Sequence, residues 1–378
     1  MCGIVAQSGI VVAALPTKRG RVTRMAGNIG LLFASIATGL VIAEVGARYI
    51  GPDKPARYLM FSGETFHLDQ NGAVRYVPNK TIRTVAVYNN AVEYDVTFHT
   101  NNLGLIDDKD YLYETNRNKS YYAFVGDSFT AGYHGGKPWI PTLREAMNSD
   151  DAEVYNLGVS GTGVEHFFRL LKSTEEQIRM SHIVILAISD DFHRESWYPY
   201  ANGSEIRFCN DNIQRSECSK RRPIATIISS TSSNEEILKT ANDMKVVDVP
   251  HSTRESFPGK SQLLALITRT LSDIRRKDGD KDISSSLKAL IRIREAFAHA
   301  EIHLIHLPEK QEVARGAYSL SNLGDSVREI GMDYFPALKE CGWSESMFHV
   351  NDSHPNASGY ANMAKCVSGY LFGRKDNA

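Results

Sequence analysis

The chain has 378 residues, of which 42% are hydrophobic and 23% charged, and its formal net charge at pH 7 is −1. That length is enough for one large domain with attachments. A net charge this close to zero gives no electrostatic basis for binding nucleic acid, so we expect no nucleic-acid partner.

The first predicted element is a transmembrane helix over residues 25–47. Residues 25–43 carry no charged side chain, which nearly suffices to cross a hydrocarbon core of about 30 Å. Because the basic residues cluster before this stretch, the positive-inside rule predicts a cytoplasmic segment 1–24. The rest would be periplasmic, on a single-pass protein of the inner membrane. A cleaved signal peptide is the alternative, although the apolar run is long for one and residues 43–47 form a poor cleavage site.

Residues 51–115 are predicted to form a small β-rich segment. Residues 81–88 and 93–100 alternate in the manner of strands, and Asn89-Asn90 between them is a turn signal, so a hairpin is expected. Asn101 follows the hairpin. We consider it either a turn residue or a side chain that reaches a binding site.

A buried strand is predicted at residues 122–125, and it ends in Gly126-Asp127-Ser128. Open α/β sheets bind their ligands beyond the carboxyl ends of their strands. A helix that begins at this serine would favour the negative charge that develops during acyl transfer. The alternative is that Asp127 and Ser128 merely cap that helix.

Strands and helices then alternate along the chain, which predicts an α/β fold: a three-layer α/β/α sandwich around a mainly parallel sheet. His303 and His306 lie in the last predicted strand without the i, i+4 spacing of a helical metal site, so we expect core or edge histidines, and neither a metal nor a cofactor. The predicted strands cover 152–157, 182–188 and 301–307, and the predicted helices cover 139–147, 165–172, 283–300 and 356–372.

The polar stretch 193–281 is interpreted as an insertion over the strand ends, with a helix at 261–276. Trp197 is a candidate for stacking on a sugar ring, although ordinary packing is the commoner role of such a residue. Two disulfides would be reasonable outside the cytoplasm, and unpaired thiols are the alternative. The candidate cysteines are Cys209, Cys218, Cys341 and Cys366.

Near the end of the chain, Asp352 and His354 stand two residues apart before a helix-like tail. A serine nucleophile needs a base, and the base needs an acid that orients it. Gly126-Asp127-Ser128 together with the block from Asp352 to Pro355 resembles the SGNH (GDSL-type) hydrolase family, in its membrane-anchored bacterial form. The resemblance covers about 118–372, apart from the insertion, and implies a hydrolase domain over 118–378 with a flavodoxin-like fold.

The resemblance implies a role for several residues. Ser128 would be the nucleophile, His354 the base and Asp352 the acid, with Asn351 as the second choice for the acid. The oxyanion hole would use the backbone of Ser128 and of Gly161, while Asp127 would be a weaker candidate for substrate contact.

One position departs from the family pattern. Asp190 stands where the family has an asparagine that donates to the oxyanion. An ionised carboxylate only accepts hydrogen bonds. Burial must therefore keep a proton on Asp190, or the hole uses backbone groups alone, or the protein is catalytically weak.

The function implied is a serine esterase that removes O-acyl groups, in particular O-acetyl groups, from an envelope or exported polysaccharide. Its partners would be an acylated carbohydrate or a small ester, and the membrane. An O-acyltransferase acting on the same glycans is one alternative. A non-catalytic glycan-binding or assembly protein that retains the fold is another, and Asp190 is the feature that favours it.

Overall fold

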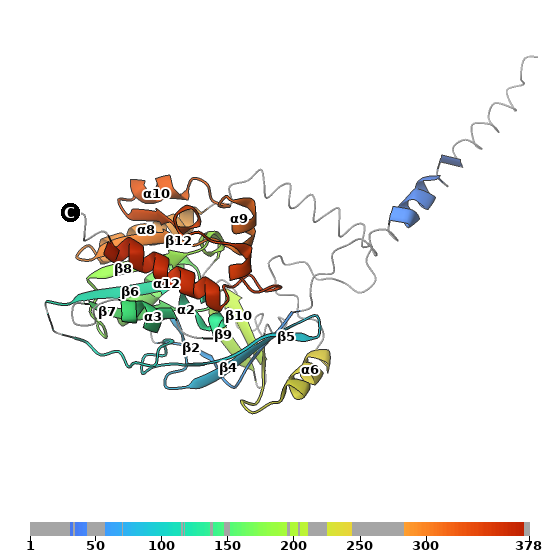
Figure 1. Ribbon diagram of the computed structural model, residues 1–378, viewed down its shortest axis with the longest axis horizontal. Coiled ribbons are helices and arrows are strands. Elements are labelled where there is room, and N and C mark those ends of the chain that lie inside the picture. Colours follow the sequence, from blue (N-terminus) through green and yellow to red (C-terminus); the bar gives the residue numbers. More distant parts are fainter. Residues whose placement is uncertain are drawn as a thin grey trace, which may run out of the picture. The chain divides into compact units, whose positions relative to one another are not determined.

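The computed structural model (Figure 1) describes most of the chain after residue 57 and part of one helix before it. The chain divides into two compact units, one made of 1–53 and 254–279 and the other of 54–253 and 280–378. The described residues are 31–32, 35–43, 57–69, 71–114, 116, 118–136, 139–146, 152–194, 197–202, 205–210, 225–243 and 283–373.

In the first unit, the described residues 31–32 and 35–43 are helical, and apolar side chains such as Leu31 and Leu40 are exposed. No helix within the described ranges is both long and apolar enough to cross a membrane. The predicted span 25–47 lies partly outside those ranges, so a membrane span stays a prediction. The predicted helix 261–276 lies wholly outside them.

The second unit is built on a five-stranded parallel sheet in the order β13-β12-β8-β6-β7. This is the flavodoxin-like order, in which the chain reverses direction between β6 and β8 and leaves a crevice at the carboxyl ends of those two strands. Four of the five strands were predicted. The fifth, β13, has no run of buried residues that would reveal it. The strands are β6 (Ser120–Gly126), β7 (Ala152–Gly158), β8 (His182–Ala187), β12 (Glu301–His306) and β13 (Asp333–Pro336).

Helices cover both faces of this sheet, as the three-layer prediction requires (Figure 1). On one face, Tyr122 and Phe124 of β6 pack with α3 (Trp139–Ala146) and α12 (Ala357–Phe372). On the other face, alternate residues of β6 pack with three further helices. Both faces are buried, which explains the nearly continuous apolar runs of the central strands. The three helices are α4 (Val164–Thr174), α8 (Ser284–Ala296) and α10 (Leu323–Glu329).

A second, six-stranded sheet has the order β5-β4-β1-β11-β10-β9. The predicted hairpin is confirmed as the antiparallel pair β4–β5, and Asn89 and Asn90 at its turn have φ of 48° and 61°, as a two-residue hairpin turn requires. The strands are β1 (Arg57–Phe61), β4 (Thr81–Tyr88), β5 (Ala91–His99), β9 (Trp197–Asn202), β10 (Glu205–Asn210) and β11 (Ala225–Ile227).

This sheet joins two parts of the chain that were predicted as separate segments. Strands β9 to β11 come from the predicted insertion, and β1 pairs with β11 in parallel. Figure 1 shows β4 and β5, in blue, beside β9 and β10, in yellow-green. A separate short hairpin consists of β2 (Phe66–Leu68) and β3 (Val74–Tyr76). Helix α6 (Asn234–Asp243) packs on the six-stranded sheet.

The β-rich segment and the parallel sheet share one hydrophobic core. Phe66 and Tyr76 from the first belong to the same cluster of buried side chains as Ile185 of β8 in the second and Phe167 of α4, which covers it. Tyr76 Oη also lies 3.0 Å from Ser160 Oγ, in the turn that follows β7. The β-rich segment therefore helps to position the loops at the carboxyl edge of the parallel sheet.

Candidate active site

Three side chains that the sequence proposed as a set lie in hydrogen-bonding contact at this carboxyl edge. Ser128 Oγ is 2.8 Å from His354 Nε2, and His354 Nδ1 is 2.5 Å from Asp352 Oδ1. Ser128 is 6% exposed, Asp352 2% and the His354 side chain 15%. The hydroxyl, the imidazole and the carboxylate form a continuous chain of contacts. Of the three groups, the imidazole is the most exposed to solvent.

The serine stands at the start of a very short helix, α2 (Ser128–Ala131). Asp127 caps this helix, because its Oδ1 accepts a hydrogen bond of 2.8 Å from the Phe129 amide. Ser128 occupies the first helical position, where the backbone amide has no partner within the helix. Asp127 thus caps the helix, while the hydroxyl of Ser128 lies 2.8 Å from the imidazole and 3.1 Å from Asp127 Oδ2, to which it can also donate.

A glycine lets this short helix lie close to the neighbouring strand. A Cβ added at Gly158, the last residue of β7, would lie 2.1 Å from the Ala131 amide nitrogen. Any side chain at this position would push α2, and the serine with it, out of place.

Asp352 and His354 lie on a loop between η3 (Glu345–Met347) and α12. The loop closes through an antiparallel bridge between Phe348 and Pro355, and Asn356 caps α12 by accepting from the amides two and three residues later. Within the loop, the backbone amide of His354 also donates to Asp352 Oδ1 at 3.2 Å. Local backbone contacts thus set the orientation of the acid relative to the imidazole.

Two distant side chains hold the same loop in place. Lys310 Nζ donates to the carbonyls of His349 and Val350, at 2.7 Å each. Glu93 of β5 accepts from the backbone and side-chain amides of Asn351, at 2.9 and 2.8 Å. Asn351, the second choice for the orienting acid, is therefore bound to the β-rich segment and not to His354.

A disulfide joins Cys341, after α11 (Ala337–Glu340), to Cys366 in α12. It encloses the loop that carries Asp352 and His354. The other candidate cysteines lie outside this description, because the side chains of β10, including Cys209, and all of residue 218 are not among the described parts of the chain.

A second imidazole stacks on His354. The ring of His134, in η1 (Tyr133–Gly135), lies 3.7 Å from the His354 ring between centroids, at an interplanar angle of 6°. The His134 ring also stacks on Tyr133, with centroids 3.9 Å apart, and His134 is 2% exposed. This stack fixes the plane of the His354 ring and leaves its two nitrogens directed at Ser128 and Asp352.

Beneath the serine, Arg194 binds three carboxylates. Its Nη1 donates to Asp127 at 2.8 Å and to Asp191 at 2.7 Å, and its Nε donates to Asp190 at 3.0 Å. Burial alone would lower the pKa of Arg194, but the charges of Asp191, Asp127 and Asp190 outweigh burial and raise it. Burial, followed by the charge of Asp127, raises the pKa of Asp191 well above its usual range.

This ion-pair network changes the interpretation of Asp190. The sequence suggested that Asp190 could donate to an oxyanion if burial kept it protonated. In the structure its carboxylate accepts from Arg194, and the Asp190 side chain is 29% exposed. Asp190 is thus an acceptor in an ion pair with Arg194. Gly161 has φ of 76°, a conformation that favours glycine.

The weaker substrate candidates fall into different places. Asn101 is 3% exposed, and its side chain accepts from the Leu103 and Leu105 amides and donates to the Lys109 carbonyl. It is a turn residue, the first of its two expected roles. Asp127 is fully buried beneath Ser128. Trp197 begins β9, whose side chains the structure does not describe.

A carboxyl group with a shifted pKa lies at the end of the neighbouring strand. Burial, together with the charges of Glu312 and Asp190, raises the pKa of Glu309 to about 8. Glu312 is fully buried and accepts from Ser189 Oγ at 2.6 Å. His306, predicted as a core or edge histidine, is completely buried, and burial lowers its pKa to about 3.

Sequence reasoning missed Arg194, Glu93, Lys310 and His134. Arg194 had a usable signal, because it follows Asp190 and Asp191 by four and three residues, the spacing at which side chains meet on one helical face. Glu93 is separated from Asn351 by 258 residues, and no local pattern announces such a contact.

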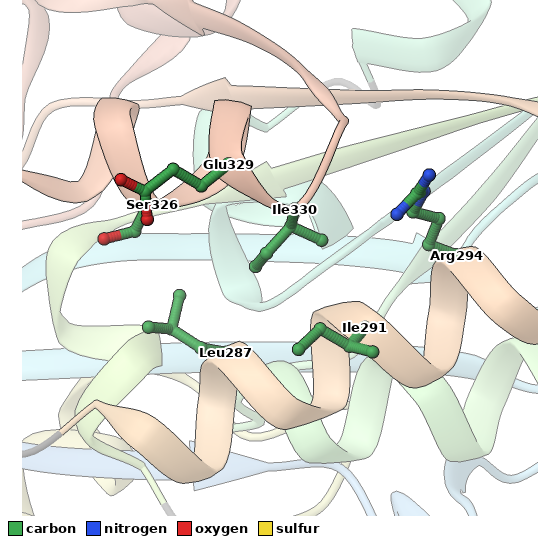
Figure 2. Close-up of a pocket in the computed structure, with 6 residues that line it drawn as sticks. All are labelled: Leu287, Ile291, Arg294, Ser326, Glu329 and Ile330. Atoms are coloured by element: carbon green, nitrogen blue, oxygen red, sulfur yellow. The ribbon is translucent and has the colours of Figure 1, made fainter.

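Two surface hollows are present in the described part of the chain, and neither contains the triad residues. One, of about 410 Å³, lies between η1, α3 and the start of α12, and its lining residues include Trp139 and Tyr360. The other, of about 360 Å³, lies between α8 and α10; Figure 2 shows Leu287 and Ile291 of α8 facing Ile330 at the end of α10. Neither hollow is lined by Ser128, Asp352 or His354.

Comparison with solved structures returns distant likenesses. TesA matches at a TM-score of 0.37 and 13% identity over 67% of this chain and 99% of that chain. The esterase EstA from Pseudoalteromonas sp. matches at 0.33 and 14%, over 67% and 99%. A two-domain esterase active on acetylated mannans matches at 0.35 and 13% over 68% of this chain, which spans 50% of that protein's length. No curated protein sequence matches.

The family is decided by a sequence profile and not by these distant likenesses. The profile of the GDSL-like lipase/acylhydrolase family matches residues 122–367, which include both β6 with its serine and the loop with Asp352 and His354. The chain therefore belongs to the GDSL-like lipase/acylhydrolase family, and it is a hydrolase of ester bonds.

Proposed function

We propose that the chain is a serine esterase that acts through a Ser128–His354–Asp352 triad and removes O-acyl groups from carbohydrates. The observation that carries the proposal is the unbroken contact from Ser128 Oγ to His354 Nε2, and from His354 Nδ1 to Asp352 Oδ1, at 2.8 and 2.5 Å. These are the partners and the distances that proton transfer from a serine requires.

In the proposed reaction, His354 takes the hydroxyl proton as Ser128 attacks the ester carbonyl. Asp352 accepts a hydrogen bond from Nδ1 and stabilises the imidazolium that forms. His354 then gives the proton to the departing alcohol, and an acyl group remains on Ser128. A water molecule, activated by the same imidazole, attacks the acyl carbonyl and releases the acid.

The oxyanion is proposed to be held by the backbone amides of Ser128 and Gly161, without a side-chain donor. The ion pair between Asp190 and Arg194 supports this assignment, because it engages the carboxylate as an acceptor. Loss of one donor slows related chemistry by about 10² to 10³-fold without abolishing it. We therefore expect the chain to catalyse ester hydrolysis at a moderate rate.

The proposed substrate is an acetylated polysaccharide of the cell envelope, and the proposed location is the outer side of the inner membrane, anchored through residues 25–47. The disulfide Cys341–Cys366 supports an oxidising compartment. The exposed apolar side chains of Leu31 and Leu40 support an apolar environment for that helix.

The test is the release of acetate by the purified full-length chain from p-nitrophenyl acetate and from acetylated mannan or xylan. Ser128→Ala should lower the rate by about 10⁴-fold or more, because the nucleophile is removed. The circular dichroism spectrum should stay unchanged, because the buried hydroxyl is replaced by a smaller group. Equal turnover by the variant would remove Ser128 as the nucleophile.

The same preparation separates the two alternatives. A fluorophosphonate that labels active serines should modify the parent chain and not Ser128→Ala. An unlabelled parent would indicate a non-catalytic protein that retains the fold. Addition of a glycan acceptor tests acyl transfer, because a transferase would yield acylated glycan in place of free acetate.

A further inference from the structure

Four side chains with metal-binding groups lie at the amino edge of the parallel sheet, at the opposite ends of the strands from Ser128. His182 begins β8, Glu301 begins β12, His303 follows two residues later, and Asp333 begins β13. Glu301 pairs with His182, and His303 pairs with Asp333, in the parallel register. Paired residues, and residues two apart, project from the same face of a sheet, so all four share the face that α12 covers.

The potential ligand atoms of three of these side chains converge. Glu301 Oε2 is 3.4 Å from His182 Nδ1 and 4.0 Å from His303 Nε2, and the three atoms all lie within 4.8 Å of one another. Ligand bonds of about 2.0 to 2.2 Å in a tetrahedral zinc site place neighbouring ligand atoms about 3.4 Å apart. One pair already fits. A rotation of the Glu301 side chain, which is 73% exposed, can shorten the second distance.

We propose that His182, Glu301 and His303 bind a divalent transition-metal ion of the zinc type, with solvent as the fourth ligand. Two imidazoles and one carboxylate suit zinc, cobalt, nickel or copper, whereas magnesium and calcium prefer oxygen alone. No local sequence pattern predicts this cluster, because His182 is 119 positions before Glu301 in the chain and only the register of β8 with β12 brings them together.

Neighbouring groups already orient both imidazoles. The His182 ring stacks on Tyr122, with centroids 4.2 Å apart and an interplanar angle of 8°. His303 Nδ1 faces Asp333 Oδ2 at 3.4 Å, and Tyr370 of α12 donates to the same carboxylate oxygen. A proton on Nδ1 that points at Asp333 leaves Nε2 with its lone pair directed toward Glu301. Carboxylates behind ligating histidines commonly set the tautomer in this way.

The consequence would be structural, not catalytic. The ion would tie β8 to β12 directly, and would tie both to β13 and α12 through Asp333 and Tyr370. All of these contacts lie at the other end of the strands from the triad, so occupancy should leave the esterase reaction unchanged. The proposal is independent of the proposed triad.

The experiment is a titration of the purified full-length chain, without an affinity tag, with ZnCl₂ by calorimetry and with CoCl₂ by visible absorption. A His354→Gln background removes the imidazole beside Ser128 as a competing ligand. We expect one ion per chain and a Tm that rises with zinc. His303→Gln and His182→Gln should each weaken binding at least tenfold, and Asp333→Asn about tenfold, as loss of a supporting carboxylate does.

The matched control is His299→Gln, which changes an exposed histidine two residues before Glu301 and outside the cluster. It should bind zinc as the parent does. Glu301→Gln serves as a second variant, because its exposed side chain can be changed without disturbing the core. Equal affinity of His299→Gln, His303→Gln and Glu301→Gln for zinc would overturn the proposal, as would the absence of stoichiometric binding by the parent.

Discussion

At the carboxyl edge of the parallel sheet, Asp127 and Asp191 are completely buried against Arg194, whereas at the amino edge Glu301 and Asp333 are 73% and 47% exposed. The same strand β8 contributes to both edges, with His182 at its start and Asp190 and Asp191 after its end. A buried charge needs a fixed partner, because desolvation is otherwise too costly. An exposed charged group can exchange its partner for a proton or an ion. The first edge is therefore built for fixed geometry, and the second for reversible binding.

The largest expected effect is at Arg194. Arg194→Met would leave the carboxylates of Asp127 and Asp191 buried without their cation, which should lower the free energy of unfolding by about 3 to 5 kcal/mol. The measurement is urea denaturation of the parent and the variant. Arg194→Met combined with Asp191→Asn should recover part of the loss, since one of the two buried carboxyl groups that lost their partner is then replaced by a neutral amide. A decrease in the free energy of unfolding of less than about 1 kcal/mol would mean that the carboxyl edge tolerates carboxylates without a fixed partner, as the amino edge does.

A smaller effect is expected in the pH dependence of stability. Burial, with the charges of Glu312 and Asp190, raises the pKa of Glu309 from 4.5 to about 8 in the folded chain. The stability that comes from the protonated form is fully present below about pH 4.5 and is lost as the pH rises through about 8. One such group contributes a slope of at most about 1.4 kcal/mol per pH unit.

Glu309→Gln should remove that contribution. The measurement is the difference between the parent and variant free energies of unfolding at intervals from pH 5 to pH 9. The variant should become more stable relative to the parent as the pH rises. Glu329→Gln, in the exposed part of α10, is the matched control for the replacement of a glutamate by glutamine at the surface. Parallel curves for Glu309→Gln and the parent would show that Glu309 ionises as an exposed glutamate does.

The smallest effect is expected at Glu93, which links the β-rich sheet to the loop with Asp352 and His354. Glu93→Gln keeps the size of the side chain but removes the charge from its hydrogen bonds to Asn351. An exposed charged contact contributes up to about 1 kcal/mol, so kcat for p-nitrophenyl acetate should fall about two- to fivefold, with KM little changed. Glu64→Gln, an exposed glutamate in the same segment, should leave kcat unchanged. Equal values for the two variants would show that the loop is held without Glu93.

Local patterns predicted the parallel sheet well, because its strands are buried on both faces and are therefore continuously apolar. Residues 182–188 gave β8, and 301–307 gave β12, within one residue at either end. The residues Ser128, Asp352 and His354 were proposed from two short motifs and lie together in the structure. Motifs of this kind are recognisable because the chemistry requires particular residue types at short spacing.

The rest of the architecture depends on contacts between distant segments. The polar stretch after Phe192 was interpreted as an insertion, yet its strands β9 to β11 complete the sheet that begins at β1. Neither half contains the information that the other will pair with it, because strand pairing depends on tertiary packing more than on local propensity. The same holds for Lys310, which was not singled out in the sequence and binds two carbonyls of the loop with His354.

The bond between Cys341 and Cys366 has a practical meaning for anyone who prepares this protein. A host whose cytosol keeps thiols reduced would deliver a chain in which the last helix is attached to the preceding turn by packing alone. A host that exports the chain would deliver the cross-linked form. The two preparations would be chemically different proteins, and substrate profiles measured on one should not be transferred to the other.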